Sequence, residues 1–225
     1  MNEEELSKYQ YDPLYGYVEK LKNNKHGFMD TKTGEIIIPV KYENSFGFFD
    51  GLAVVKLDGK WGIIDEKDNV ILKIKYDKIK SFENGIFAIK LKEKYGFYNI
   101  HKRKIIMPMK YDYIEQFLDL ICVGLEKKFG FFNNKLIQVV PFIYDYVDID
   151  NYEVNNNIIC VGQNKKLGFI DGETGKIVIP IICDNILKSD IRFVKVVING
   201  KIVCYENKDN EWNINNTSPI KSCPI

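Results

Sequence analysis

Short apolar runs alternate with turn residues along most of the chain. Runs of about four to eight residues rich in Ile, Val, Phe and Tyr, bounded by Gly, Asn and Asp, are typical of β-strands joined by hairpins. Residues 51–85 show the pattern most clearly and predict strands at Gly51–Leu57, Trp61–Ile64 and Val70–Ile74, with a weaker one at Tyr76–Phe82. Asp58-Gly59 between the first two is a hairpin turn signal.

This pattern returns about every 35 residues. Five glycines mark the copies, with separations of 35, 34, 34 and 38 residues: Gly27, Gly62, Gly96, Gly130 and Gly168. A tyrosine followed by an acid moves with them, at Tyr42, Tyr76, Tyr111 and Tyr144. Cys183-Asp184 is the degenerate fifth copy of that pair, and Gly200–Glu206 begins a degenerate sixth repeat with Val203 in place of the glycine. A fixed period of this length is the signature of a repeat architecture.

The period accommodates three to four short antiparallel strands per copy and no helix. We therefore predict an all-β single repeat domain over residues 1–225, with five clear repeats and one degenerate repeat over about 16–206. Residues 1–15 and 207–225 are predicted to be terminal caps, with a helix conceivable only at Glu3–Tyr9 and a last strand around Trp212. The units stack either as a twisted superhelix or as a small propeller-like ring, because one unit cannot bury its own apolar face.

Several repeated residues have a structural interpretation. The glycine permits a bulge or a close backbone approach, and the aromatic before it supplies buried area. These aromatics include Trp61, Tyr95 and Phe129, and the tyrosines of the Tyr-acid pairs are expected to be further repeat anchors. Asp and Asn exchange at the position that opens the next turn, as in Asp65 and Asn99, which indicates hydrogen bonding to backbone.

These motifs resemble the WG β-repeat family of tandem arrays. The best matches are Gly59–Asp65, which reads G-K-W-G-I-I-D, and Ile37–Glu43, which reads I-I-P-V-K-Y-E. Only Trp61-Gly62 keeps the name-giving dipeptide, and His26, Tyr95, Phe129 and Leu167 replace the tryptophan elsewhere. The resemblance implies a scaffold of antiparallel strands with a binding role, and it implies no catalytic residues.

Composition narrows the function classes. Lys and Arg number 32 against 31 Asp and Glu, which excludes a uniformly basic nucleic-acid binder, and 13% aromatic residues exclude a disordered chain. Neither a signal peptide nor a stretch long enough to span a bilayer is evident, so we expect a cytoplasmic protein without membrane association. The five cysteines have no metal-site or disulfide-framework spacing and are expected to be reduced, with Cys122 and Cys160 in the core.

No catalytic, cofactor-binding or metal-ligating motif appears among the residues, so we expect no enzyme, no cofactor and no metal site. A hydrolase or lyase that uses the repeated acids is the least favoured alternative. Those acids are Glu43, Asp77, Asp112, Asp145 and Asp184.

A lysine opens each copy, two residues before the glycine position. These six residues form a candidate binding stripe: Lys25, Lys60, Lys94, Lys128, Lys166 and Lys201. With neighbouring aromatics, the stripe could bind nucleic acid or phosphate ligands, although a solubilising rim of the hairpins is the favoured interpretation. The leading hypothesis is a non-enzymatic protein-binding module. One concrete form is a cytoplasmic inhibitor, such as a phage-type antagonist of a host defence enzyme.

Overall fold

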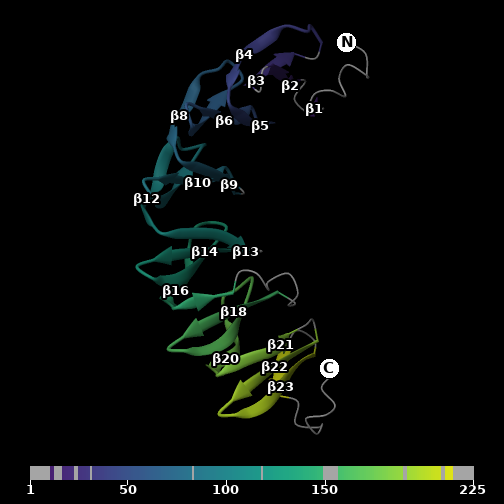
Figure 1. The fold of residues 1–225 in the computed structure, drawn as a ribbon, viewed down its shortest axis with the longest axis vertical. Coiled ribbons are helices and arrows are strands. Elements are labelled where there is room, and N and C mark those ends of the chain that lie inside the picture. The colour runs from purple at the N-terminus through teal and green to yellow at the C-terminus, as the bar shows by residue number, and fades with distance from the viewer. Residues whose placement is uncertain are drawn as a thin grey trace. The chain divides into compact units, whose positions relative to one another are not determined.

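The computed structural model describes residues 11–12, 17–22, 25–30, 32–82, 84–117, 119–148, 157–189, 192–208 and 211–214, and these residues contain 24 β-strands and no helix. By internal contacts the chain divides into two compact units, Met1–Lys110 and Tyr111–Ile225. Each unit contains three four-stranded antiparallel sheets (Figure 1). The prediction of all-β tandem units with three to four antiparallel strands is therefore confirmed.

The strands of the first unit fall into sheets β1–β4, β5–β8 and β9–β12. Their bounds are β1 Tyr11–Asp12, β2 Tyr17–Lys22, β3 Lys25–Asp30, β4 Ile36–Tyr42, β5 Asn44–Phe49, β6 Leu52–Leu57, β7 Lys60–Asp65, β8 Val70–Tyr76, β9 Lys78–Ser81, β10 Ile86–Leu91, β11 Lys94–Asn99 and β12 Lys104–Tyr111.

The strands of the second unit fall into sheets β13–β16, β17–β20 and β21–β24. Their bounds are β13 Tyr113–Phe117, β14 Leu120–Leu125, β15 Lys128–Asn133, β16 Gln138–Tyr144, β17 Tyr146–Val147, β18 Ile158–Gln163, β19 Lys166–Asp171, β20 Ile177–Cys183, β21 Asn185–Ser189, β22 Phe193–Ile198, β23 Lys201–Lys208 and β24 Glu211–Ile214.

Sheets are offset from the sequence repeat. The weak strand predicted after Tyr76 exists as β9, but it pairs with β10 and thereby starts the next sheet. The Tyr-acid pair thus stands where the chain leaves one sheet and enters the next. The degenerate sixth repeat is a complete sheet, in which Val203 pairs with Val196 as Gly168 pairs with Val161.

The cores lie between successive sheets of each unit. Adjacent residues of a third strand point to opposite faces and enter different cores. Ile63 packs with Phe87 and Ile89 of the following sheet, whereas Ile64 packs with Phe28 of the preceding one. In the second unit, Phe169 and Ile170 divide in the same way between two cores. A sheet covered on both faces explains why three consecutive third-strand residues are buried.

The predicted terminal segments are only partly described. Trp212 lies in β24, so the strand expected in the C-terminal cap is confirmed. The helix considered at 3–9, and most of the caps at 1–15 and 207–225, lie outside the described residues. The single domain and the choice between superhelix and ring stay predictions.

Three cysteines agree with the expected core role, while one does not. Cys122, Cys160 and Cys183 are free and buried. Cys204, in contrast, is disulfide-bonded, so the expectation that all five thiols are reduced is wrong for this residue.

Candidate functional site

The glycine of each repeat lies where the fourth strand crosses the third. A Cβ atom at Gly168 would stand 2.7 Å from the Ile179 carbonyl oxygen and 2.8 Å from the Ile181 Cα atom. The pairing of β19 with β20 shifts register at this point, between Leu167 and Phe169. At Gly27, Gly62, Gly96 and Gly130, the nearest fourth-strand atom would stand 2.5–2.8 Å from an added Cβ. The missing side chain therefore permits the close approach and bulge inferred from the sequence.

The fully buried residue of the third strand is the one after the glycine, and not the aromatic residue before it that the sequence predicted. The residue before the glycine is half-buried at Trp61, Tyr95 and Phe129, whereas the residue after it is nearly inaccessible. Phe97 and Phe131 both have 0% exposure. Both residues lie on the same face of the sheet, as Trp61 and Ile63 contribute to the same core. They differ in burial because the residue before the glycine is next to the hairpin end of the third strand.

The tyrosines of the Tyr-acid pairs are buried at the end of each fourth strand, with relative exposures of 1, 3, 4 and 2% for Tyr42, Tyr76, Tyr111 and Tyr144. Burial raises the pKa of each of these phenols. At Tyr42 the hydroxyl also donates a hydrogen bond to Asp68 Oδ1, 2.5 Å away, which reaches in from the next sheet. Cys183 takes this position in the degenerate copy and is equally buried.

Each candidate stripe lysine is the first residue of the third strand in its sheet. Ion pairs join stripe lysines to the repeated acids. Lys60 Nζ lies 2.5 Å from Asp77 Oδ1, and Lys25 Nζ lies 4.0 Å from Glu43 Oε1. Lys128 pairs with Asp145, and Lys166 with Asp184. These lysines stay 40–49% exposed. The acids nevertheless offset much of their positive charge.

The second oxygen of the repeated acid binds the backbone of the following hairpin. Asp77 Oδ2 accepts from the Lys92 amide at 2.8 Å, and Asp145 Oδ2 accepts from the Asn164 amide at 2.9 Å. The Lys60 ammonium and then the Lys92 amide hold the pKa of Asp77 below its ordinary value. One carboxylate thus connects the third strand of one sheet to the hairpin turn of the next. We call this arrangement the acid clasp.

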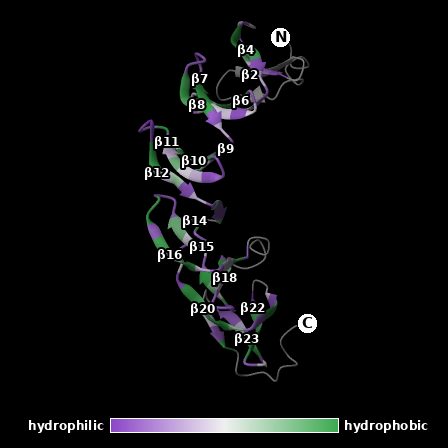
Figure 2. Cartoon of the chain, turned by 60° about the vertical axis from the view of Figure 1, so that its left-hand side comes forward, coloured by the Kyte–Doolittle hydropathy of each residue, from purple (hydrophilic) through white to green (hydrophobic). Residues whose placement is uncertain are grey.

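A row of exposed apolar side chains was missed in the sequence. The fourth strand presents a large aliphatic residue at the same repeat position in four sheets, three residues before the proline position. Their relative exposures are 51% for Ile36, 53% for Val70, 46% for Ile105 and 57% for Ile177. We call these four residues the aliphatic row after their shared repeat position; three belong to the first unit and Ile177 belongs to the second. Figure 2 shows the hydrophobic colouring of the fourth strands that carry them.

A signal for the aliphatic row was present in the sequence. It was the repeat position itself, three residues before the proline position. Burial does not simply alternate along these strands, since in Ile36-Ile37-Ile38 only Ile38 is buried, at a register shift between β3 and β4. Three successive isoleucines conceal this difference, because their hydropathy is the same.

An exposed aromatic pair lies in the second sheet. A register shift between Ser45 and Phe48 leaves Phe46 outside the ladder, where it is 70% exposed. Its ring stacks on Trp61 with centroids 5.1 Å apart and an interplanar angle of 12°. Lys56 Nζ lies 5.9 Å from the centre of the Trp61 ring. The name-giving tryptophan is therefore half-buried: it packs against the core between the second and third sheets and also stacks on the exposed ring of Phe46.

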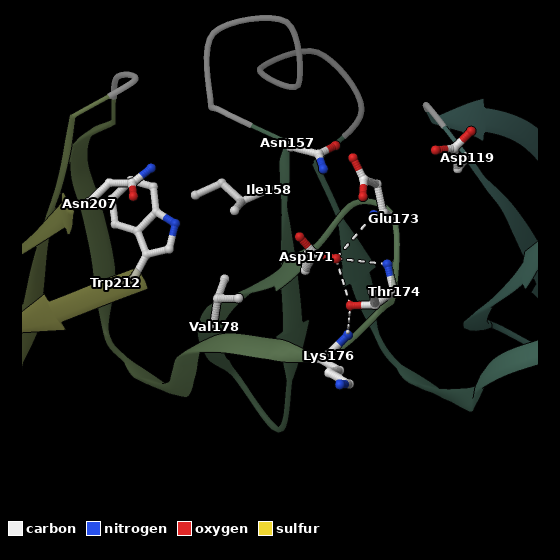
Figure 3. A pocket seen from close by; sticks show the side chains of 10 residues that line it. All are labelled: Asp119, Asn157, Ile158, Asp171, Glu173, Thr174, Lys176, Val178, Asn207 and Trp212. Atoms are coloured by element: carbon white, nitrogen blue, oxygen red, sulfur yellow. Dashed lines mark hydrogen bonds between the residues drawn. The ribbon is translucent and has the colours of Figure 1, made fainter. Parts of the chain in front are cut away.

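The second unit contains a cavity of about 970 Å³. It lies beside the turn between β19 and β20, and Figure 3 shows Trp212 at one end of it and Asp119 at the other. The described residues that line it are Asp119, Asn157, Ile158, Asp171, Glu173, Thr174, Lys176, Val178, Asn207 and Trp212. None of them belongs to the stripe or the anchors derived from the sequence.

The described residues contain neither a candidate metal site nor a helix that could span a membrane. No group of three or more His, Cys, Asp and Glu side chains there is arranged to hold a metal ion. The described part of the chain likewise has no helix with the length and apolarity to cross a membrane.

Comparison with known protein families identifies two of the repeats. The family model described as WG containing repeat matches residues 27–61 and 61–95. The predicted membership is confirmed for these two consecutive repeats, which span the first and second crossing glycines. No curated protein matches the chain.

Solved structures resemble the chain only at low similarity. Kluyveromyces lactis Hsv2p is 12% identical with a TM-score of 0.41, covering 89% of this chain and 81% of its own. The N-terminal domain of Nup159 is 9% identical with a TM-score of 0.42, covering 92% of this chain and 77% of its own. At these TM-scores the likeness carries no argument about function.

Proposed function

We propose that this chain, in which residues 27–95 contain two consecutive WG repeats, is a non-enzymatic protein-binding module. The observation that carries the proposal is the aliphatic row. A solvent-facing position on a strand has no need of a large apolar residue, yet four sheets place one there with about half of its surface exposed. Exposed apolar surface that recurs at one structural position is typical of protein interaction sites.

The contact mode follows from the neighbouring proline. Pro39, Pro108 and Pro180 stand three residues after row positions, within the fourth strand. Proline has no N–H to donate, so it interrupts the ladder that an added strand would need. The partner therefore binds through the side chains of the row and not by extending the sheets.

The acid clasps support a binding role over catalysis. Asp77, Asp145 and Asp184 have lowered pKa values, chiefly because each accepts a hydrogen bond from a lysine ammonium. A carboxylate that stays ionised and occupied by backbone and lysine donors is poorly suited to proton transfer near neutral pH. We accordingly assign these acids to holding sheets together.

The same pairing weakens the case for nucleic acid along the lysine stripe. Nucleic-acid binding draws most of its affinity from unpaired cations that neutralise phosphates. Four stripe lysines instead have a carboxylate within ion-pair distance.

A cytoplasmic inhibitor, including a phage-type antagonist of a host defence enzyme, is the specific form of protein binding that we favour.

Affinity capture from an extract of the source cells tests the function. The first variant replaces the row by threonine, Ile36→Thr, Val70→Thr, Ile105→Thr and Ile177→Thr, which keeps β-branching and therefore strand propensity. The second replaces all six stripe lysines by glutamine. We expect one protein to bind the wild type and the glutamine variant after nuclease treatment, and the threonine variant to lose it by at least tenfold.

The opposite pattern refutes the proposal. Loss of all captured material on nuclease treatment, or loss only in the glutamine variant, would assign the function to nucleic acid. Far-ultraviolet circular dichroism and urea unfolding of each variant establish that a loss of binding is not a loss of fold.

A further inference from the structure

The aromatic pair of the second sheet differs from the aliphatic row and the acid clasps in both place and chemistry. Phe46 lies in β5 and Trp61 in β7, and their rings meet across β6, which pairs with both strands. The two rings are nearly parallel, with an interplanar angle of 12°. Trp61 is half-buried, whereas 70% of Phe46 is exposed. The pair therefore presents a flat aromatic ring to solvent.

Phe46 is held in place by the bulge that carries it. The Ser45 amide donates a hydrogen bond to Asn44 Oδ1 at 2.7 Å, and the Gly47 amide donates one to Ser45 Oγ at 3.1 Å. Ser45 is buried, and Gly47 has a φ of +76°, a conformation that favours glycine. Local bonds thus fix the backbone on both sides of the ring. A ring displayed from a fixed backbone loses little conformational entropy when a partner contacts it.

Lys56 places a cation beside the rings. It pairs directly with Asn44 on β5 and with Trp61 on β7, and its Nζ atom lies 5.9 Å from the centre of the Trp61 ring. Within the part of the chain that the structure describes, no Asp or Glu forms an ion pair with this ammonium. Its charge is therefore available to an incoming anion.

The third sheet contains the same lysine with its charge neutralised. Lys90 occupies the position of Lys56, and its Nζ atom lies 5.4 Å from the centre of the Tyr95 ring. Glu93 of the following turn, however, places Oε2 2.7 Å from that ammonium. The corresponding turn residue of the second sheet is Gly59, which has no side chain to offer. The turn sequence thus explains why only one of these two lysines is open.

The third sheet also lacks the exposed ring. Its first strand, β9, pairs with β10 without a register shift, and Lys80 stands third after the tyrosine of the Tyr-acid pair plus one, where Phe46 stands in the second sheet. An open cation and an open ring therefore occur together in the second sheet and not in the third. Neither feature serves the core, since the third sheet packs without them.

We propose that Phe46, Trp61 and Lys56 receive an aromatic side chain of the protein partner that is flanked by a carboxylate. The inference rests on the proposed function and adds the chemistry of one contact. The partner's ring stacks on Phe46, and an adjacent Asp or Glu pairs with Lys56. A ring is favoured over an aliphatic side chain because stacked aromatic pairs gain energy beyond the area that they bury. A peptide is favoured over single-stranded nucleic acid because a nucleic-acid strand needs several unpaired cations, and Lys60 beside the rings is already paired with Asp77.

Fluorescence anisotropy of dye-labelled peptides tests the inference on the full chain. The probe is a Gly-Glu-Phe-Glu-Gly amide, in which the ring has a carboxylate on either side. One matched peptide replaces both glutamates by glutamine, and another replaces phenylalanine by cyclohexylalanine, which is apolar but has no π system. We expect saturable binding of the probe, about fivefold weaker binding of the glutamine form and about threefold weaker binding of the cyclohexylalanine form. Equal binding of the glutamine form, or tighter binding of a labelled oligothymidine strand, overturns the inference.

Variants assign the binding to the rings and the lysine. Phe46→Ser is expected to weaken the probe about tenfold and Lys56→Gln about fivefold. Gly59→Glu copies the neutralising carboxylate of the third sheet and should weaken the probe as much as Lys56→Gln does. Gly59→Gln is the matched control without the charge and should bind as the wild type does. Glu93 has a φ of +64° at the corresponding position, so this turn accepts a side chain. An unchanged affinity in Phe46→Ser, or equal affinities of the two Gly59 variants, contradicts the proposal.

The two proposals fail in different ways. If the captured partner depends on the aliphatic row while the probe does not bind, the aromatic contact fails and the function stands. If the probe binds and Phe46→Ser abolishes its binding, yet no captured protein depends on the row, the proposed function fails and the rings are a separate peptide site. Urea unfolding of each variant, followed by circular dichroism, separates a lost contact from a lost fold.

Discussion

The crossing glycine offers the most demanding test of the fold, and Gly168→Ala is the cleanest change. Alanine adds one methyl group and normally stabilises a chain by about 0.4–1 kcal/mol, because it restricts the unfolded state. Gly168 does not have a positive φ, so the backbone conformation itself tolerates alanine. Any loss of stability must therefore come from the space that the methyl group meets.

That space is filled by backbone. The three nearest atoms to an added Cβ are Ile179 O at 2.7 Å, Ile181 Cα at 2.8 Å and Pro180 O at 2.8 Å. No side chain can rotate away, so β20 must move by about 1 Å to reach ordinary contact. Overpacking of this kind costs about 1–3 kcal/mol, and one weakened ladder hydrogen bond adds about 1 kcal/mol. After the unfolded-state gain, we expect a net loss of about 2–3 kcal/mol.

Urea unfolding measures this loss, with Trp212 fluorescence as the probe in a Trp61→Phe background. With a slope of about 3 kcal/mol per molar urea, the midpoint falls by about 0.7–1 M. Gly200→Ala is the matched control, since Gly200 has φ +74° and no atom within 4 Å of an added Cβ. It should lose about 1 kcal/mol from the left-handed conformation alone.

An unchanged or higher midpoint for Gly168→Ala would refute the close-approach explanation. The last sheet shows what happens when the glycine is absent. Val203 occupies the glycine position there, and the described part of β24 pairs only with Tyr205–Lys208, without a register shift, so it does not cross the strand at Val203. The glycine is therefore required by the crossing strand and not by the third strand itself.

Three further predictions concern the clasps, the turns and the thiols. Replacing Asp77, Asp145 and Asp184 by asparagine should lower the melting temperature at pH 7. Because the native pKa values of these carboxyl groups are depressed, the wild type should lose its advantage over the variant as the pH falls from about 5 through those pKa values. An equal difference in melting temperature at pH 7 and at pH 3 would contradict the clasp. Asp65→Ala should cost about 1–2 kcal/mol in urea unfolding while Asp65→Asn costs much less, since Asp65 Oδ1 accepts from the amides of Lys67 and Asn69 as Asn133 Oδ1 does from those of Lys135 and Ile137. Because burial raises the pKa of Cys122 and brings that of Cys160 to about 12, a thiol reagent at pH 8 should label both much more slowly in the native protein than in 6 M guanidinium, and equal rates would place these residues outside the core.

Local chemistry made part of the molecule predictable. The turn at Asp65 follows from a short acceptor side chain that bonds the next amides, and Asn99 accepts from the Lys102 amide in the same way. Exchange between Asp and Asn therefore predicted this contact correctly. The strand at Trp212 and the degenerate last sheet were equally legible, because hydrophobic runs and turn residues act within a few positions of the chain.

Other features depend on what packs against each position. The aliphatic row was missed because Ile36 and Ile38 have the same hydropathy, and only the stacking of neighbouring sheets leaves one exposed and the other buried. Trp61 is only half-buried, and the fully buried residue is Ile63, on the other side of the glycine. The cavity joins residues as far apart as Asp119 and Trp212, which no local pattern connects.

The near balance of 32 basic and 31 acidic residues illustrates both what the sequence determines and what only packing decides. By itself, the sequence determined the repeat, its strands, its turns and the recurrence of one lysine and one acid in each copy, because these depend on residue type and spacing. Tertiary structure alone decided that the acid following one strand pairs with a lysine 17 residues earlier, as Asp77 does with Lys60, and also caps the next hairpin. Such a contact requires two sheets to stack, and stacking depends on apolar burial summed over whole faces.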